Sequence, residues 1–387
     1  MPTISVVVFF VVTLAVNLLT AYAAGNILPY FTSFSYFDIL ELKYKYLPKF
    51  ISSFANFDGV HYVLIADSGY FHYQETFFPL YPLFIRYLSP IFGNDFIVSG
   101  LVISNLCFIA GIFVFIKYLQ KFLSSKLETV GFWTVLFLLT FPTSFFFNSL
   151  YTEGLFFLLF ISSLYLFEKK RYLPAAVLSF LTALTRLTGI FLIIPFAIRL
   201  FQTRKQKKSP NTKYLILNIL APIAGLLSYS FYLWKAVGVN DPLAFIHYQS
   251  AFNANRSAGK IITLPQVIYR YFKIFITAAP NYQYFISLLE FVVFFFILTL
   301  LILDLIKSYK NKSQARIGLN LFSLANLILP TMSGTLSSIP RYALMSISAF
   351  IYLGEIKSKT LKISLAVVFF ILRIILLGMF IQGYFVS

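Results

Sequence analysis

The sequence predicts an all-α membrane protein that crosses the bilayer many times. Of its 387 residues, 59% are hydrophobic and only 11% are charged, which is outside the usual range of soluble globular domains. The apolar residues form continuous runs of about 20, not the alternating pattern of a membrane β-barrel. We therefore expect a single transmembrane domain of packed helices over residues 1–387.

The apolar runs can be assigned in order along the chain. The first, at 4–24, has no Lys or Arg ahead of it, so we interpret it as a retained helix and not as a signal peptide. Further spans are expected at 97–116, 129–147, 150–167, 213–236, 284–306, 317–336, 341–356 and 363–383. Two pairs of these, at 129–167 and 317–356, form helical hairpins. Together the runs predict about nine transmembrane helices.

Residues 173–200 do not fit as one more span. They are apolar but lie between two basic segments, Lys169–Arg171 and Arg204–Lys208, which should both be cytoplasmic. A re-entrant pair of half-helices resolves this conflict, with Thr185–Gly189 near its tip. Broken helices of this kind are tolerated where they line a protein cavity, and they bring the total to about 11 membrane helices.

The basic residues predict the orientation. Five short segments hold 19 of the 31 Lys and Arg residues together with four acids: 117–128, 168–172, 199–213, 304–316 and 355–362. The positive-inside bias places these segments and the N-terminus in the cytoplasm. The loops at 25–96 and 237–283, and the C-terminus, then lie outside. The net charge of +18 therefore reflects membrane orientation, and we expect no nucleic-acid partner.

The first outer loop contains the strongest candidate for a site. The stretch from Asn56 to Tyr70 holds two acids and one of the three histidines of the chain. It predicts a short helix with Asn56 as its N-cap, Asp58 in the first turn, where the helix dipole favours an anion, and Gly69 as its end. On such a helix Asp58 and His61 share one face.

The predicted topology gathers ionisable residues on the outer side: Asp58, Glu153, Arg186, Asp241, His247 and Arg341. Ionisable groups near membrane depth cost about 3 kcal/mol or more at the bilayer centre and are usually functional. The single Cys107 excludes a thiolate metal site within one chain, and no serine-nucleophile motif is present. An aspartate with arginines nearby suits group transfer from an anionic lipid.

Several segments also carry a family resemblance. Phe57-Asp58-Gly59-Val60-His61-Tyr62, followed by Phe78-Pro79-Leu80-Tyr81-Pro82, resembles the first-loop signature of PIG-V-type mannosyltransferases. These GT-C glycosyltransferases include the second mannosyltransferase of GPI-anchor assembly and its prokaryotic relatives. Further similar segments follow in the same order: Pro142–Ser144 with Tyr151–Glu153, Thr185–Gly189, Asp241–Gln249 and Pro340–Tyr342. The family usually has Trp at the position of Phe57, an aromatic exchange that leaves the acid in place.

The resemblance implies a GT-C-type bundle in a prokaryotic cell membrane, with its active site on the extracytoplasmic side. It implies transfer of a sugar, usually mannose, from a polyprenyl- or dolichyl-phosphate donor to a hydroxyl of a lipid-linked or other glycan acceptor. The anomeric centre is inverted by direct attack, with Asp58 as the base. No cofactor is implied, and the sequence leaves a need for a divalent cation open.

Six further residues are candidate substrate ligands: His61, Glu153, Arg186, His247, Gln249 and Arg341. Each has a structural alternative. Glu153 could orient hydroxyls or cap a helix, and the arginines could hold the donor phosphate or pair within the protein. His61 could bond to Asp58 or to phosphate, or be a partly buried structural histidine. The segment with His247 and Gln249 opens at Asp241, which is typical of a turn before proline.

Two other functions are compatible with the sequence. A lipid or glycolipid transporter would show inverted repeats and ionisable residues in several helices. No such repeat is evident, and Arg373 is the only charge deep in the late spans. A non-catalytic GT-C-like scaffold that binds lipid-linked sugars would have no need for Asp58.

Overall fold

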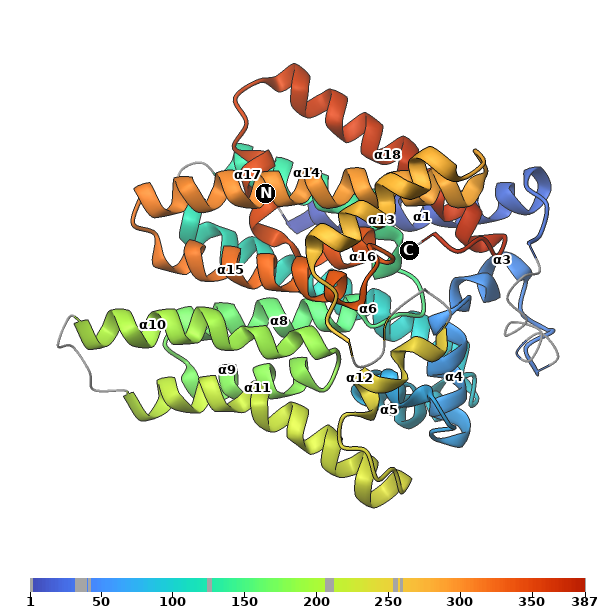
Figure 1. Cartoon of the computed structure of the whole chain (residues 1–387), viewed down its shortest axis with the longest axis horizontal. Coiled ribbons are helices and arrows are strands. Elements are labelled where there is room, and N and C mark those ends of the chain that lie inside the picture. The colour runs from blue at the N-terminus through green and yellow to red at the C-terminus, as the bar shows by residue number, and fades with distance from the viewer. Residues whose placement is uncertain are drawn as a thin grey trace. The chain divides into compact units, whose positions relative to one another are not determined.

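The computed structural model describes residues 3–31, 40, 43–123, 127–205, 212–252, 257 and 260–386, and all the secondary structure of these residues is helical (Figure 1). The chain divides into two compact units. Unit 1 comprises Met1–Phe71, Phe77–Tyr165 and Ile356–Val386, and unit 2 comprises His72–Thr76, Leu166–Glu355 and Ser387. The expectation of a single domain stays a prediction.

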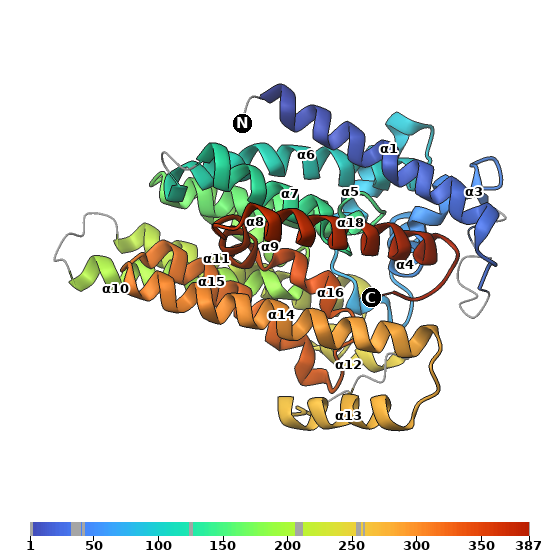
Figure 2. The same cartoon turned by 90° about the horizontal axis from the view of Figure 1, so that it is seen from above.

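Unit 1 holds the helices of the chain up to Tyr165, except the short η2, together with the last helix. Its elements are α1 (Thr3–Ile27), α3 (Lys49–Ser52), η1 (Ser53–Ala55), α4 (Asp58–Ser68), α5 (Leu80–Leu88), α6 (Phe96–Leu123), α7 (Phe132–Thr140), η6 (Ser144–Phe147), most of α8 (Glu153–Glu168) and α18 (Lys359–Ile381). Figure 2 shows α1 alongside both α6 and α18. Buried phenylalanine rings fill the interior, with Phe108 stacked on Phe147 at 4.1 Å between ring centroids.

A chain of polar side chains crosses the apolar interior of unit 1. Arg373 of α18 is only 2% exposed and donates to the side-chain oxygen of Asn17 in α1. Asn17 donates to Asn148 Oδ1 at 3.1 Å, and Asn148 donates to Asn105 Oδ1 at 2.8 Å. Buried polar groups are costly unless they are hydrogen-bonded, so these amides hold the arginine inside the span.

Unit 2 holds the middle of the chain. Its longer helices are α9 (Tyr172–Ala183), α10 (Ile193–Lys205), α11 (Thr212–Tyr232), α13 (Leu264–Thr277), α14 (Tyr282–Lys310), α15 (Gln314–Ile328) and α17 (Ile347–Gly354). Its short elements are η2 (Gln74–Thr76), η7 (Leu187–Leu192), α12 (Ala244–His247), η9 (Tyr248–Phe252), η10 (Leu329–Ser333), α16 (Ile339–Tyr342) and η11 (Ala343–Met345). Gly225 lets α11 approach α9 closely, since a Cβ there would lie 2.5 Å from the Phe180 carbonyl oxygen.

The segment at 173–200 is broken, as predicted. Helix α9 ends at Ala183, residues 184–186 form the turn, and η7 continues directly into α10, which runs back. The start of α9 and the end of α10 therefore lie at the same end of unit 2 in Figure 1. A Cβ at Gly189 would lie 2.6 Å from the Thr182 carbonyl oxygen, so the close packing of η7 against the end of α9 requires glycine. The depth of the pair in a bilayer stays a prediction, and Lys207 and Lys208 lie outside the described residues.

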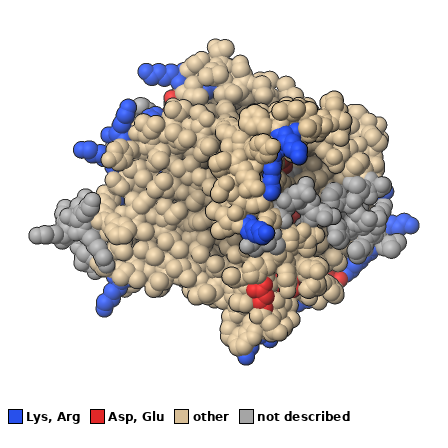
Figure 3. Space-filling model, in the orientation of Figure 1, with Lys and Arg blue, Asp and Glu red and all other residues tan. Residues whose placement is uncertain are grey.

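Among the described residues, five helices are long and apolar enough to cross a membrane: Val7–Ile27, Phe96–Lys121, Thr212–Val237, Tyr282–Lys310 and Lys359–Ile381. They confirm the five predicted single spans, and the chain is a multi-pass membrane protein. Uncharged side chains accordingly cover most of the face seen in Figure 3.

The predicted hairpin spans are shorter or interrupted helices. Pro142 follows the end of α7, and Pro330 and Pro340 stand at the starts of η10 and α16. Proline lacks the N–H that a continuous helix needs, which explains these breaks. The structure thus supports an all-α membrane fold, while the count of about 11 membrane helices stays a prediction.

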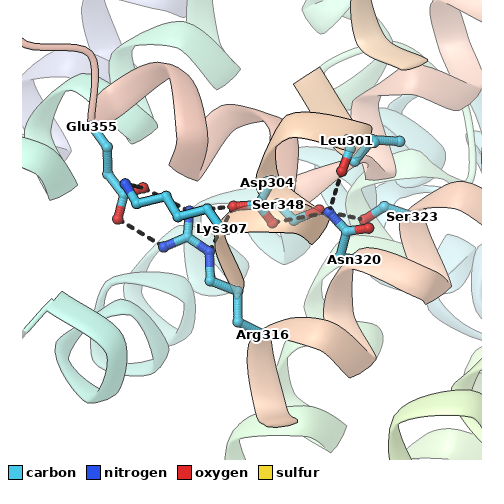
Figure 4. A network of polar contacts seen from close by, with 8 residues as sticks. All are labelled: Leu301, Asp304, Lys307, Arg316, Asn320, Ser323, Ser348 and Glu355. Carbon is cyan, nitrogen blue, oxygen red and sulfur yellow. Dashed lines mark hydrogen bonds and ion pairs between the residues drawn. The ribbon is translucent and has the colours of Figure 1, made fainter. Parts of the chain in front are cut away.

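One end of α14 is tied to α15 and to the residue after α17 by buried charges (Figure 4). The Arg316 guanidinium donates to Asp304 Oδ1 through Nε at 2.8 Å, and to Glu355 Oε1 and Oε2 at 2.7 and 2.8 Å. Asn320 donates to Asp304 Oδ2 at 2.9 Å, and Lys307 donates to Glu355 at 2.7 Å. The network lies at the end expected to be cytoplasmic.

Candidate active site

Asp58 is the first residue of α4, as predicted, and its side chain is partly exposed. The residue before it, Phe57, has φ 58° and ψ −116°, a backbone conformation that is strained for an aromatic residue. Strain of this kind persists only where the surroundings enforce it, and it is common at functional sites. The helix dipole favours the charged form of the Asp58 carboxylate at this position. Gly69 ends the helix with φ 88°, also as predicted.

The predicted N-cap role of Asn56 is wrong. Its side-chain amide donates instead to the carbonyl oxygens of Phe380 and Ile381, at 2.8 and 3.2 Å. These carbonyls are in the last turn of α18, where helix carbonyls need partners from outside the helix, and the Phe380 carbonyl also accepts from Gly383 N at 3.1 Å. Asn56 is 3% exposed. Its buried amide therefore donates to the last carbonyls of α18 and holds the segment that leads into α4.

The loop before α8 supports the Asp58 turn from the other side. Leu150 N donates to the Phe54 carbonyl at 3.0 Å, and the Tyr151 hydroxyl donates to the Asn56 carbonyl at 2.9 Å. A Cβ at Gly59 would lie 3.2 Å from the Leu150 carbonyl oxygen, so a larger residue after Asp58 would require this carbonyl to shift by a few tenths of an ångström. Unit 1 therefore brings the Tyr151–Glu153 segment against the turn that presents Asp58.

Glu153 is the first residue of α8 and is 1% exposed. Gly154 lets the start of α8 lie against α6, because a Cβ there would be 2.3 Å from the Ser104 carbonyl oxygen. The Ser104 hydroxyl in turn donates to the Tyr151 carbonyl at 3.0 Å. This first-turn position suits an acid electrostatically. A role of Glu153 toward substrate stays a prediction.

His61 is buried and stacks on Phe77, with 4.7 Å between ring centroids and 20° between ring planes. Burial lowers the pKa of His61 to about 4, although the nearby Asp58 carboxylate acts to raise it. The imidazole is therefore neutral at neutral pH. It can hold a substrate only through neutral hydrogen bonds and cannot supply positive charge to a phosphate.

The two arginines belong to unit 2. Arg186 stands at the start of η7, and its guanidinium carbon lies 5.0 Å from the centroid of the Tyr342 ring. Tyr342 follows Arg341 in α16, and its carbonyl accepts a 2.8 Å hydrogen bond from Asn326. The structure thus places Arg186 against the residue next to Arg341. A single cavity shared by both arginines and Asp58 stays a prediction.

His247 and Gln249 are both engaged within their own segment. Asp241 forms the predicted turn, accepting from Leu243 N at 2.9 Å, and its other oxygen lies 2.6 Å from His247 Nδ1. Burial acts to raise the pKa of Asp241, but the bonds from His247 and from Leu243 N outweigh it and lower the pKa. Gln249 donates to the Phe245 carbonyl at 3.3 Å. Their roles as substrate ligands stay predictions.

Comparison with known proteins assigns the family. The family model described as Mannosyltransferase (PIG-V) matches residues 3–206, more than half of the chain. This chain belongs to the PIG-V mannosyltransferase family. The match includes Asp58, Glu153 and Arg186 but ends before Arg341.

Two curated relatives are similar over a shorter segment. Both are named GPI mannosyltransferase 2 and come from Cryptococcus neoformans var. neoformans serotype D, strains JEC21 and B-3501A. Each is 32% identical to this PIG-V family member over 146 residues, which is 35% of this chain and 34% of the relative. The matched segment thus spans about a third of the length of these relatives.

Sequence reasoning missed a group of residues in unit 2 of this PIG-V family member: His72, Tyr73, Glu75 and Tyr248. The three rings are in contact, and Glu75 is 2% exposed. The available signal was the aromatic density of Tyr70–Tyr73. The position of Tyr248 against these rings depends on tertiary folding and cannot be read from the sequence.

The low pKa of His61 predicts a pH-dependent stability for this PIG-V family member. Below pH 6.5 the unfolded chain binds a proton at His61 that the folded protein accepts only near pH 4. The free energy of unfolding should therefore fall as the pH falls through this window, by about 3 kcal/mol at about 1.4 kcal/mol per pH unit. Unfolding of the detergent-solubilised protein measured between pH 4 and 7 should show a smaller slope for His61→Phe. Equal slopes would contradict this prediction.

Proposed function

We propose that this PIG-V family member transfers mannose from a polyprenyl-phosphate donor to a hydroxyl of a lipid-linked or other extracytoplasmic acceptor, with inversion. The observation that carries the proposal is Asp58, which stands at the N-terminus of α4 after a strained residue. Hydrogen bonds from Asn56 to α18 and from Tyr151 to Asn56 hold this turn. A carboxylate fixed in this way is suited to act as a base in a family of sugar transferases.

The reaction needs one proton acceptor. The acceptor hydroxyl oxygen attacks the anomeric carbon of the donor, and its proton passes to the Asp58 carboxylate. The bond from the anomeric carbon to the phosphate oxygen breaks, and the phosphate leaves with the electron pair. Because the leaving phosphate is a stable anion, it needs no acid, unlike the leaving group of a glycoside hydrolase, which works with two carboxylates.

The leaving phosphate requires positive charge from elsewhere, since His61 is neutral. We assign this role to Arg186 and Arg341. Its support is that the Arg186 guanidinium lies against the ring of Tyr342, the residue that follows Arg341 in α16. A guanidinium binds a phosphate through two parallel N–H bonds, and such charge-assisted bonds are stronger than neutral ones.

The test is transfer by the purified protein in detergent. We expect labelled mannose to move from polyprenyl-phosphate mannose to a lipid-linked or glycan acceptor. The anomeric configuration of the product should be opposite to that of the donor. A nucleotide sugar should not replace the lipid donor. Transfer from the nucleotide sugar alone, or retention of the donor configuration, would overturn the proposal.

Arg341→Lys should raise the KM for the donor by about 10- to 100-fold, because an ammonium cannot make the planar two-bond contact with phosphate. The same assay at varied donor concentration measures this change. Lys310→Arg, on an exposed residue at the far end of α14, is the matched control and should leave donor use unchanged. An unchanged KM in Arg341→Lys would remove this residue from the phosphate site.

A further inference from the structure

Unit 2 carries a compact cluster of three aromatic rings outside its long helices. His72 lies next to Tyr73 with 3.8 Å between ring centroids. Tyr248, which opens η9, lies 5.3 Å from the His72 ring and 5.4 Å from the Tyr73 ring. We call His72, Tyr73 and Tyr248 the aromatic triad. It joins the segment after α4 to the segment after α12, in loops expected on the outer side.

The backbone of the triad is strained. Tyr73 has φ 74°, which is rare for a bulky residue, and its side chain is 45% exposed. Burial therefore does not account for the ring's position. Strained residues that remain accessible are a recurrent feature of binding sites.

A buried carboxylate accompanies the triad. Glu75 is 2% exposed, and among the described residues its Oε2 atom has no hydrogen-bond partner. The Tyr229 hydroxyl donates to the Glu75 backbone carbonyl at 2.7 Å, which fixes the turn η2. An unsatisfied buried carboxylate oxygen is costly, so this atom is matched to a donor that the described part of the chain does not supply.

The charged groups near the triad are carboxylates. The pKa of Tyr248 is raised by partial burial and then by the nearby charges of Glu75 and Asp241. Two carboxylates beside the rings disfavour a phosphate. The described residues also contain no group of three or more carboxylate, imidazole or thiol side chains arranged to hold a metal ion. The site is therefore matched to a neutral ligand that donates hydrogen bonds.

We propose that the aromatic triad and Glu75 bind a sugar ring of the acceptor glycan, an assignment that rests on the proposed transfer function. A sugar presents C–H bonds on the face of its ring, which pack on aromatic side chains. Its hydroxyls donate to carboxylates, which act only as acceptors when ionised. The rings of Tyr73 and Tyr248 can pack on the C–H face of the sugar, and Glu75 Oε2 can accept a hydrogen bond from one of its hydroxyls.

The chain links this site to the proposed base. Asp58 opens α4, Gly69 ends it, and His72 follows three residues later. The helix that presents Asp58 is thus followed in sequence by two members of the triad, His72 and Tyr73.

The test is direct sugar binding to the full-length protein in nanodiscs. The probes are methyl glycosides of mannose, glucose and galactose, and saturation-transfer NMR detects their binding. We expect at least one glycoside to bind, and both Tyr248→Ala and Glu75→Gln to weaken it by about 10-fold. Tyr248→Phe should keep most of the affinity, since it retains the ring. Tyr269→Ala, a 69% exposed tyrosine of α13, is the matched control and should bind as the wild type does.

The outcomes separate this site from the transfer reaction. Equal affinity in the wild type and both variants, or no binding of any glycoside, would overturn the site. Thermal unfolding shows whether Glu75→Gln folds, and Tyr248→Ala, at a partly exposed position, provides the second variant. Triad-dependent binding in a protein that transfers no sugar would support the site and refute the proposed function. If the protein transferred sugar and Tyr248→Ala left the KM for the acceptor unchanged, the proposed function would be supported and the site at the triad refuted.

Discussion

Asp58→Asn should lower kcat by about 10²- to 10⁴-fold, the usual contribution of a general base. Asparagine keeps the shape of the side chain at the start of α4 but cannot take the proton from the attacking hydroxyl. Because the donor phosphate is assigned to arginines, donor affinity should change little. Turnover at saturating substrate and donor binding measured separately, on the purified protein, distinguish these two effects.

The same helix offers a matched control. Asp67 lies near the other end of α4, where its carboxylate is 2.7 Å from Lys43 Nζ in an exposed ion pair. Exposed pairs of this kind contribute about 1 kcal/mol or less, so Asp67→Asn should leave turnover and folding nearly unchanged. If Asp58→Asn and Asp67→Asn had the same turnover as the wild type, Asp58 would not be the base, and only the family assignment would stand.

The parts of α4 that were predictable depend on local chemistry. Asp58 at the first turn and Gly69 at the end follow from the helix dipole and from the freedom of glycine at positive φ. The role of Asn56 was not predictable, because its partners are carbonyls at the other end of the chain. Statistics of N-cap residues describe a helix in isolation and contain no information about a distant helix that needs donors.

The same distinction holds for the spans and for the outer loops. Hydropathy located the long single helices, since length and apolar content are properties of a window of sequence. It overestimated the hairpin spans, because Pro142, Pro330 and Pro340 interrupt helices without changing the mean hydropathy much. The contact between His72 and Tyr248 and the unsatisfied oxygen of Glu75 are tertiary properties. A single sequence carries no signal for them.

Arg316→Met should destabilise the protein by about 3–5 kcal/mol, the cost of leaving buried charges without their partner. Asp304 is fully buried, and Arg316 is the cation that pairs with it. Methionine fills similar space but supplies no donor. Of their partners among the described residues, Asp304 would then keep the amide of Asn320, and Glu355 would keep Lys307. Unfolding of the detergent-solubilised protein, followed by helical circular dichroism, measures the loss.

Lys307→Met removes a positive charge from the same network at an exposed position, so it shows how much of the loss of stability in Arg316→Met depends on burial. Lys307 also pairs with Glu355, but its side chain is 42% exposed, so its removal should cost about 1 kcal/mol or less. Replacing Asp304, Arg316 and Glu355 together by apolar residues of similar size should recover most of the stability, because no buried charge is then left unpaired. An Arg316→Met variant as stable as Lys307→Met would show that water or lipid headgroups reach Asp304 and that the network does not hold α14 to α15.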